Sequence, residues 1–433
     1  MDRAGIVRLD KRHVWHPYTP MDAWEGEDPI VVARAKGAWL EDIDGQRYLD
    51  GNSSWYVAVL GHGHPRILRA MREQAATLAH CALAGIAHEQ AACLAEELAA
   101  IAPPGLDRVF YVDDGSTAID AAVKMCAQGR RQLGEQRRTR FVALDSAYHG
   151  DTLGAVSLGG VDVFRRPYAG VTFECVHAPF PEAGAYERAF DAMKTLLREE
   201  GDSIAAVFVE PVVQGVAGMR VYDPEYLREL RALCDASGVW LVFDEVFSGY
   251  GRTGAMWASE HAGVSPDILC IGKAFAAYVP MAAVLANERV FAAFRGGRER
   301  AFFHGHTFCG NPLGAAMARE VLAVFRDERI VDRVRAHAPV IEHAFARIAA
   351  LPGVERVRTI GMIGAADLRV EPGRTAGYLE DAGWRVYAEA RRRGAYLRPL
   401  GSTVYVCPPL TIERAELEQL LAILEESVRV VTA

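Results

Sequence analysis

The chain has 433 residues, of which 51% are hydrophobic and 24% charged, a composition typical of folded globular proteins. Its 48 basic and 56 acidic residues give a net charge of −8 without a concentrated stripe of lysine and arginine, so nucleic acid is not an expected partner. The longest uncharged, mostly apolar run, residues 274–286, is shorter than the about 20 residues that cross a bilayer, so no membrane span is expected.

The cysteines and the N-terminal sequence indicate a cytoplasmic protein. The eight cysteines are scattered and form no C-x-x-C pair, which is typical of reduced thiols. Residues 1–17 are charged throughout and lack the apolar core of a signal peptide. We therefore expect no export.

The first half of the chain changes from one strand pattern to another. Residues 30–50 alternate apolar and polar side chains and contain turns at Lys36-Gly37 and Asp44-Gly45, which predicts a small antiparallel meander. From about residue 61 to 325, short continuous apolar runs alternate with helical patterns, as in strands covered on both faces. The expected strands are 108–112, 140–144, 205–210, 239–244, 267–272 and 281–286, with helices such as 116–131 and 224–237 between them.

This alternation predicts an α/β fold with a mostly parallel central sheet covered by helices. After about residue 327 the pattern becomes a long helix, short strands at 364–370, 395–398 and 403–407, and a final helix from Glu413. We expect an N-terminal arm and meander (1–60), a large domain (61–327) and a C-terminal part (328–433). The two chain ends together would form a smaller α+β domain.

Asp244 and Lys273 stand at the ends of two successive predicted strands. The 29 residues that separate them leave room for one helix and one strand, so the two side chains could lie at one edge of the sheet. A carboxylate and a lysine so placed suit a pyridine aldehyde cofactor, with the carboxylate on the ring nitrogen and the lysine as an imine on the aldehyde. An N-cap aspartate and a surface lysine are the equally compatible alternative.

Three further segments follow predicted strands. Gly115 and Ser116 open a helix, where free backbone N–H groups can bind a phosphate, although Ser116 or Thr117 could be only an N-cap. Tyr148 lies in a glycine-containing loop and could stack on a cofactor ring or pack on the loop. Glu210 ends a buried strand and could line the same site or be a surface terminus.

The histidines of residues 302–318 raise the question of a metal site. His304 and His306, with His62 and His64, are of a ligand type that metals prefer. Histidine pairs on loops without a nearby carboxylate cluster are more often hydrogen-bonded structure, so we expect no metal.

Six strings occur in a fixed order along nearly the whole chain, and each alone would be a weak motif. They are G-S-T-A (115–118), Y-H-G (148–150), E-P-V-V-Q-G (210–215), D-E-V-F-S-G-Y-G-R-T-G (244–254), G-K-A (272–274) and H-T-F-C-G-N-P-L (306–313). In this arrangement the chain resembles the class-III aminotransferases, which are fold-type-I enzymes dependent on pyridoxal 5′-phosphate. An aminotransferase with this cofactor is therefore implied.

The resemblance implies roles for the residues that match these strings. Lys273 corresponds to the Schiff-base lysine, Asp244 to the partner of the pyridine nitrogen, and Tyr148 to the ring-stacking aromatic. Gly115 and Ser116 correspond to the phosphate cradle.

Other cofactor contacts follow from the same resemblance. Glu210 belongs to the cofactor-binding set, as does His306, and Thr307 corresponds to a residue that reaches the phosphate from the neighbouring subunit. A homodimer with shared sites is implied.

Three segments resemble one branch of the family in particular: residues 11–21 with W-H-P-Y-T, residues 50–65 and residues 396–410. That branch moves the amino group of S-adenosylmethionine to 8-amino-7-oxononanoate in biotin synthesis. The resemblance implies that an arginine at position 398 binds the substrate carboxylate, as a bidentate guanidinium can. The other implied substrate contacts are Tyr18, Trp55, Tyr56, Tyr148, Lys273, Gly305 and Tyr405.

The chain departs from the family pattern at two places. Tyr56 stands where a second tryptophan is usual, and residues 273–283 contain no glycine where a pair is usual and one residue fewer. A transaminase that uses an ω-amino acid with pyruvate, or lysine as donor, is therefore an alternative. An isomerase that shifts an amino group within one molecule and a binding protein without catalytic activity are two further alternatives.

Overall fold

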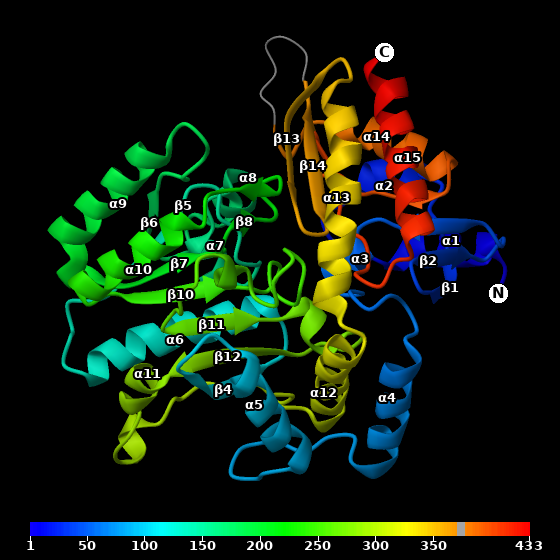
Figure 1. Cartoon of the computed structure of the whole chain (residues 1–433). Helices are drawn as coiled ribbons and strands as arrows, with labels where there is room; N and C mark the ends of the chain where they lie inside the picture. Colours follow the sequence, from blue (N-terminus) through cyan, green and yellow to red (C-terminus); the bar gives the residue numbers. More distant parts are fainter. Residues whose placement is uncertain (370–376) are drawn as a thin grey trace.

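The computed structural model describes residues 1–369 and 377–433. Its centre is a seven-stranded sheet of order β4-β12-β11-β10-β7-β5-β6 (Figure 1). β12 is antiparallel to both its neighbours and the other pairs are parallel, so the mostly parallel α/β sheet is confirmed. The strands are β4 (Leu106–Val112), β5 (Arg140–Leu144), β6 (Cys175–Ala178), β7 (Ile204–Val209), β10 (Trp240–Asp244), β11 (Ile268–Ile271) and β12 (Ala282–Asn287).

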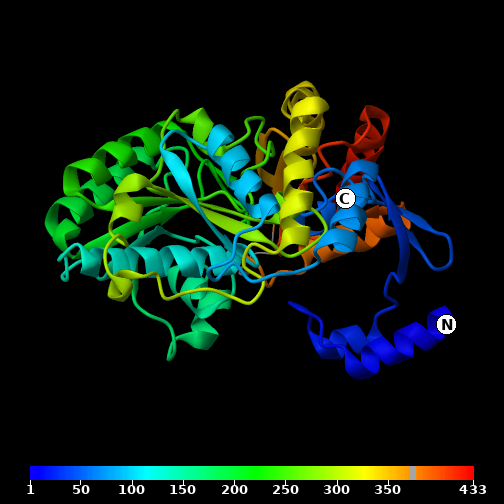
Figure 2. The same cartoon turned by 90° about the horizontal axis from the view of Figure 1, so that it is seen from below.

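Helices cover both faces of this sheet. Seen from below, α6 lies on one side, and α5, α9 and α10 lie on the other (Figure 2). Every residue of β7, β10 and β11 is buried as a result, which is why their sequences are continuously apolar. These helices are α5 (Glu89–Ile101), α6 (Gly115–Gln132), α9 (Tyr186–Glu200) and α10 (Glu225–Ser237).

The predicted N-terminal meander is present and shares a sheet with the C-terminal part of the chain. Its strands are β1 (Val32–Lys36), β2 (Trp39–Asp42) and β3 (Arg47–Asp50). β15 (Ala395–Tyr396) pairs in parallel with β3, so that Tyr396 lies opposite Asp50. Two segments more than 300 residues apart are thereby held side by side.

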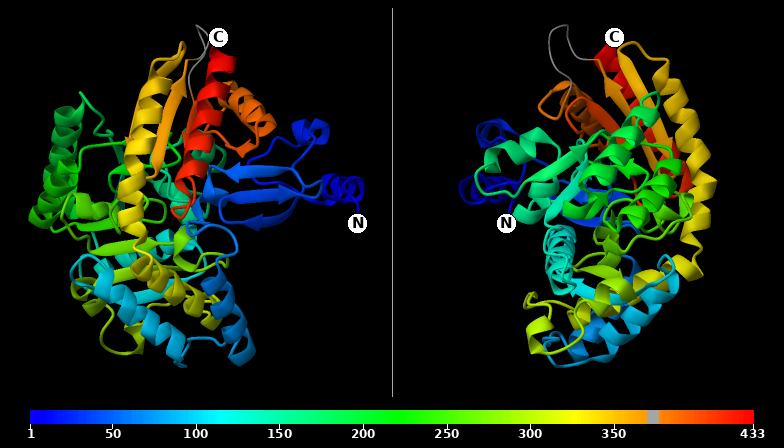
Figure 3. Two further views of the ribbon diagram at one scale, coloured as in Figure 1. Left: turned by 45° about the vertical axis from the view of Figure 1, so that its right-hand side comes forward. Right: turned by 90° about the vertical axis from the view of Figure 1, so that its left-hand side faces the viewer.

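The C-terminal part contains a second small sheet, of order β13-β14-β16, with long helices beside it (Figure 3). The predicted strand at 364–370 is β14, which ends at Leu368, and residue 370 lies outside the described residues. β13 was not expected, because its pattern is only partly buried. The elements are β13 (Val354–Ile360), β14 (Ile363–Leu368), β16 (Thr403–Val406), α13 (Ile330–Ala349), α14 (Ala382–Arg392) and α15 (Arg414–Thr432).

The remaining elements complete the fold. In residues 1–369 and 377–433, no helix has both the length and the hydropathy needed to cross a bilayer. The other helices are α1 (Arg3–His13), α2 (Met21–Gly26), α3 (Ser53–Tyr56), α4 (Pro65–Thr77), α7 (Leu153–Leu158), α8 (Asp162–Arg165), α11 (Glu288–Ala292) and α12 (Pro312–Asp327). A two-stranded ribbon joins β8 (Val213–Gln214) and β9 (Arg220–Val221).

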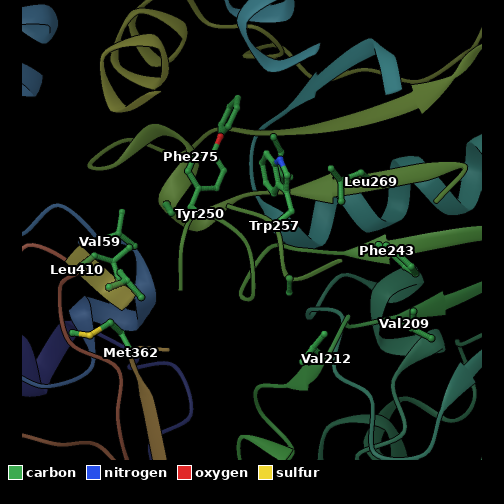
Figure 4. Close-up of a cluster of buried hydrophobic side chains, with 14 of the residues drawn as sticks. Val59, Val209, Val212, Phe243, Tyr250, Trp257, Leu269, Phe275, Met362 and Leu410 are labelled. Atoms are coloured by element: carbon green, nitrogen blue, oxygen red, sulfur yellow. The ribbon is translucent and has the colours of Figure 1, made fainter. Parts of the chain in front are cut away.

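One hydrophobic cluster extends from the central sheet to the small sheets (Figure 4). On the outer side, Leu410 packs near Val59, and its backbone N–H donates to the Val59 carbonyl at 2.7 Å. The loop after β10 is tied to the same region, because the Met362 N–H donates to the Arg252 carbonyl at 3.0 Å. The loop that follows Asp244 is thus joined to the start of β14.

Replacing Leu269 with alanine should lower the free energy of unfolding by about 2–5 kcal/mol, since the side chain is fully buried within β11. Urea unfolding followed by circular dichroism measures this change. Ile86→Ala is the control, because Ile86 is 57% exposed and its truncation should leave the unfolding midpoint nearly unchanged. Equal losses in the two variants would contradict the placement of Leu269 in the core.

Candidate active site

A cavity of about 500 Å³ opens at the carboxyl ends of the central strands. This is where α/β sheets place their ligands, because the loops that leave neighbouring parallel strands diverge there. Several of the residues singled out from the sequence line it together: Trp55, Tyr56, Gly115, Ser116, Tyr148, Glu210, Asp244 and Lys273.

A second cavity of about 360 Å³ lies near the small sheets and contains three arginines. Each of the three already contacts a carboxylate, although two of them share one. Arg220 faces Glu182 at 3.5 Å, and both Arg356 and Arg358 contact Asp367, at 2.9 and 2.7 Å. The larger cavity is therefore the better candidate for a reactive site.

Lys273 follows β11 and Gly272 and has a left-handed backbone, with φ of +49°. Its side chain ends among aromatic rings, with Nζ 5.2 Å from the centre of the Tyr56 ring and 5.6 Å from that of Phe247. Burial lowers the pKa of Lys273, and the charges of Asp244 and Glu210 offset only part of this effect. The amine is therefore easier to deprotonate than an ordinary lysine.

Asp244 ends β10 beside Lys273's strand, because β10 and β11 are parallel neighbours. Its Oδ2 lies 2.8 Å from Nδ1 of His149, and its Oδ1 accepts a hydrogen bond from the Val246 N–H at 3.1 Å. Burial lowers the pKa of His149, but the hydrogen bond and charge of Asp244 outweigh it and leave that pKa above its ordinary value. A buried carboxylate, fixed by two donors, thus forms one wall of the cavity.

Sequence reasoning did not give His149 a role, although it stands next to Tyr148 in the Y-H-G string. The histidine is fully buried and its ring reaches across to β10. Only the adjacency of β5, β7 and β10 in the sheet brings the two residues together.

Glu210 holds two loops of the cavity, those that contain Tyr148 and Gly215. Its carboxylate accepts hydrogen bonds from the Tyr148 N–H at 3.1 Å and the Gly215 N–H at 2.9 Å. Burial raises the pKa of Glu210 to about 7. Glu210 is therefore buried and functions as a support for the Tyr148 loop, so the alternative of a surface strand terminus is wrong.

Asp114 is the N-cap of α6, whereas Ser116 and Thr117 were the residues considered for that role. The Asp114 carboxylate accepts from the Thr117 N–H at 3.0 Å, and the Asp114 N–H donates to the Thr117 hydroxyl at 2.9 Å. The hydroxyl of Ser116 instead accepts from the Asp151 N–H at 3.1 Å. Ser116 thereby connects the start of α6 to the Tyr148 loop.

Gly115 lets the start of α6 approach the loop after β10. A Cβ on Gly115 would lie 2.5 Å from Cγ1 of Val246, which is too close for any side chain. The first N–H groups of a helix have no partner within the helix and bind anions well. Gly115 and Ser116 line the cavity at this helix start, and their role as a phosphate cradle stays a prediction.

Tyr148 is held by a network of polar and ring contacts. Its hydroxyl donates to Asp151 at 2.6 Å and lies 3.1 Å from the hydroxyl of Tyr18, which also hydrogen-bonds Asp151. Phe164 packs edge-on against both tyrosine rings. Burial raises the pKa of Tyr148, so its phenol stays protonated. The ring is a fixed wall of the cavity.

Trp55 and Tyr56 lie on a left-handed turn that comprises Ser53, Ser54, Trp55 and Tyr56, with φ of +49°, +45°, +57° and +70°. This conformation costs roughly 1–2 kcal/mol for each residue that is not glycine. The Tyr56 hydroxyl lies 2.7 Å from that of Tyr405, and both rings are buried. The Trp55 ring centre is 5.5 Å from that of Tyr18.

Arg398 lies beside the aromatic rings of Trp55 and Trp384. Its guanidinium carbon is 5.8 Å from the Trp55 ring centre and 4.8 Å from that of Trp384. Its Nη2 donates to the Tyr18 carbonyl at 3.2 Å, and its backbone N–H donates to Asn52 at 2.6 Å. Arg398, Tyr18 and Tyr405 do not line the cavity itself, but each contacts a residue that does.

Gly305, His306 and Thr307 do not line the cavity. His306 Nδ1 lies 3.1 Å from Asp113 Oδ2, so a carboxylate is near the histidine loop, contrary to the sequence interpretation. Asp113, His306 and Cys309 offer ligand atoms within 4.8 Å of one another. The absence of a metal stays a prediction.

The glycine-poor loop after Lys273 contains a strained alanine. Ala277 has φ of +51° and ψ of −97°, a region that favours glycine. The next residue, Tyr278, anchors the loop by donating to the Gly61 carbonyl at 2.7 Å and accepting from the His64 N–H at 2.8 Å. The loop thus keeps a glycine-like backbone without glycine.

Comparison with known proteins identifies closely similar sequences. The adenosylmethionine-8-amino-7-oxononanoate aminotransferase of Nitratidesulfovibrio vulgaris is 43% identical over 99% of this chain and 82% of its own length. The enzyme of the same name from Geobacter sulfurreducens is 39% identical over 100% of this chain and 99% of its own length.

The fold and the family agree with these similarities. The crystal structure of the adenosylmethionine-8-amino-7-oxononanoate aminotransferase of Methanocaldococcus jannaschii superimposes with a TM-score of 0.94, 31% identity and 99% coverage of both chains. An amine transaminase from an uncultivated Pseudomonas species, in its PLP-bound form, has a TM-score of 0.89 and 32% identity over 97% of this chain and 99% of its own. The family model "Aminotransferase class-III" matches residues 21–428. The chain belongs to the class-III aminotransferase family.

Proposed function

We propose that this chain is the transaminase of biotin synthesis that moves the amino group of S-adenosylmethionine to 8-amino-7-oxononanoate and forms 7,8-diaminononanoate. The observation that carries the proposal is that Tyr18, Trp55 and Arg398 contact one another beside the cavity that contains Lys273. A long alkyl chain with a terminal carboxylate needs apolar walls and a guanidinium. Relatives 39–43% identical over the whole chain carry the name of this activity.

As a class-III aminotransferase, the enzyme uses pyridoxal 5′-phosphate, whose aldehyde carries the amino group and whose ring withdraws electrons from the amine-bearing carbon. The residues present fit this group. Gly115 and Ser116 would hold the phosphate, and the buried carboxylate of Asp244 would face the ring nitrogen. The ring would lie against Tyr148, whose loop Glu210 holds in place.

Lys273 has two tasks in this proposal. Its amine would hold the cofactor through the aldehyde group. Its Nζ would also take the proton from the amine-bearing carbon of the donor, which requires a neutral amine. Burial favours that neutral form by lowering the pKa of Lys273. Asp244 stays in place throughout because His149 and the Val246 N–H hold its two oxygens.

The substrate pocket in this proposal is made from both ends of the chain. Arg398 binds the carboxylate of 8-amino-7-oxononanoate. The aromatic wall contacts the rest of the substrate, and Gly305, which lies outside the cavity of its own chain, would contact it from the neighbouring subunit. One cavity serves both amines in turn, so donor and acceptor react in a ping-pong sequence. The wall consists of Tyr18, Trp55, Tyr56, Tyr148 and Tyr405.

We further propose a cytoplasmic homodimer in which His306 and Thr307 of each subunit complete the phosphate site of the other. Their position outside the cavity of their own chain is compatible with this arrangement. Within each subunit, residues 1–60 and 328–433 would form the small domain, and residues 61–327 the large one. The sheet shared by β3 and β15 supports that division.

A second candidate is a transaminase that takes an ω-amino acid, with pyruvate as partner, or lysine as donor. The strained loop at Ala277 and the likeness to the Pseudomonas amine transaminase favour it. Purified holoenzyme with 8-amino-7-oxononanoate should form 7,8-diaminononanoate when S-adenosylmethionine is the donor. The rate of product formation should be at least tenfold lower with lysine or an ω-amino acid, a ratio that corresponds to about 1.4 kcal/mol. Mass spectrometry of the product measures this. Product formed fastest with lysine, or without any donor, would overturn the proposed donor.

Lys273→Ala should abolish transamination, because among the described residues that line the cavity Lys273 is the only lysine. The purified variant should lack the yellow absorption of a lysine-bound cofactor. Lys124→Ala is the matched control, since Lys124 lies on α6 and contacts His304, and this variant should keep its colour and most of its activity. A yellow, active Lys273→Ala enzyme would disprove the role of Lys273.

Arg398→Met should raise the KM for 8-amino-7-oxononanoate by about 10-fold to 100-fold, because a charge-assisted bidentate contact is lost. The half-reaction with the donor should change much less if the carboxylate of the acceptor is the main ligand. Arg385→Met, on the neighbouring helix α14, is a control for the loss of one positive charge. An unchanged KM in Arg398→Met would remove Arg398 from the substrate site.

A further inference from the structure

The left-handed turn Ser53–Tyr56 requires an external restraint. Four successive residues that are not glycine have positive φ, and two of them, Trp55 and Tyr56, line the cavity. Short left-handed segments persist only when their surroundings determine them. The contacts around the turn should therefore decide how these two aromatic rings are presented.

The restraint at the start of the turn is the carboxylate of Asp50, whose side chain is fully buried at the end of β3. Its Oδ2 accepts a hydrogen bond from the Ser54 hydroxyl at 2.9 Å and lies 2.9 Å from Nε2 of His62. Its Oδ1 accepts from the Asn52 N–H at 3.3 Å. One carboxylate thus binds the residue before the turn, a residue within it, and the segment that follows it.

The same turn is connected to the residues at the far end of the pocket. The Ser53 hydroxyl donates to the Cys407 carbonyl at 2.6 Å, just after β16. The side-chain oxygen of Asn52 accepts from the Arg398 N–H at 2.6 Å. A shift of the turn would therefore move Trp55, Tyr56 and the backbone of Arg398 together.

We infer that Asp50 is a positioning residue for the substrate pocket: through Ser54 and His62 it holds the left-handed turn that presents Trp55 and Tyr56 to the substrate. Asp50 does not line the cavity and acts only through the turn. The inference rests on the proposed function insofar as Trp55 and Tyr56 contact the substrate. It assigns Asp50, Ser54 and His62 a role in substrate affinity and none in proton transfer.

The test is Ser54→Ala in the holoenzyme, which removes one of the carboxylate's hydrogen bonds and no wall residue. The KM for 8-amino-7-oxononanoate should rise about fivefold, the usual effect of one lost hydrogen bond, while kcat stays within about twofold. The Kd of the same compound for the holoenzyme without donor, measured by calorimetry, should rise by the same factor. The cofactor absorption should be unchanged.

Asp50 itself is tested by a conservative pair. Asp50→Asn keeps an acceptor for Ser54 and should bind the substrate more tightly than Asp50→Ala. Where Asp50→Ala fails to fold, Ser54→Gly gives a second test, because glycine relieves the strain but also lacks the hydroxyl. It should raise Kd less than Ser54→Ala does, because part of the strain is gone.

Ser427→Ala is the matched control, since the buried Ser427 hydroxyl donates to the Ile423 carbonyl within α15, away from the cavity. It should lower thermal stability and leave KM and Kd unchanged. The inference is overturned if Ser54→Ala leaves KM and Kd at wild-type values, or if Ser427→Ala raises them equally. A wild-type enzyme that does not bind 8-amino-7-oxononanoate would refute the proposed function instead, and the same variants would then be compared with the amine that it accepts.

Discussion

The burial of the Lys273 amine beside two carboxylates is the constraint on which the active site depends. Three neighbouring parallel strands, β7, β10 and β11, end at the same edge. Asp244 is the last residue of β10, and Glu210 and Lys273 come just after β7 and β11. A buried charge needs compensating donors or charges, since its desolvation is otherwise unfavourable. The strand order of the sheet therefore places the reactive amine beside two carboxylates. It also buries their charges, which the surrounding loops must compensate.

The loops compensate these buried charges by donating hydrogen bonds to each carboxylate. Backbone N–H groups of Tyr148 and Gly215 reach Glu210, while His149 and the Val246 N–H reach Asp244. The Y-H-G string is central, because consecutive residues serve different carboxylates and also place the Tyr148 ring. A change in this loop would alter the charge balance and the cavity wall at once.

Much of the fold was predictable from sequence because strands covered on both faces are continuously apolar, as β7, β10 and β11 are. Asp244 and Lys273 were predictable because they stand at or just after the ends of such strands. β13 was missed because an edge strand that is half exposed has no such pattern.

Some contacts were missed for other reasons. The cap at Asp114 is local, but Ser116 and Thr117 offered equally good hydroxyls at the helix start, so the sequence could not choose among them. The pairs His149 with Asp244 and His306 with Asp113 join residues 95 and 193 positions apart. No periodicity or local propensity records such distances; only the folded sheet creates them.

The site combines chemistry from the middle of the chain with selectivity from its two ends. The central sheet provides Asp244 and Lys273, whereas Trp55 and Arg398 come from segments joined by the parallel pairing of β3 with β15. The strained positions, at Trp55 and at Ala277, lie where these two parts of the site meet. Strain of this kind persists only where surrounding contacts are strong. Substrate choice can therefore change through the strained segments while the lysine and its carboxylates keep their geometry, since the two sets of contacts share few residues.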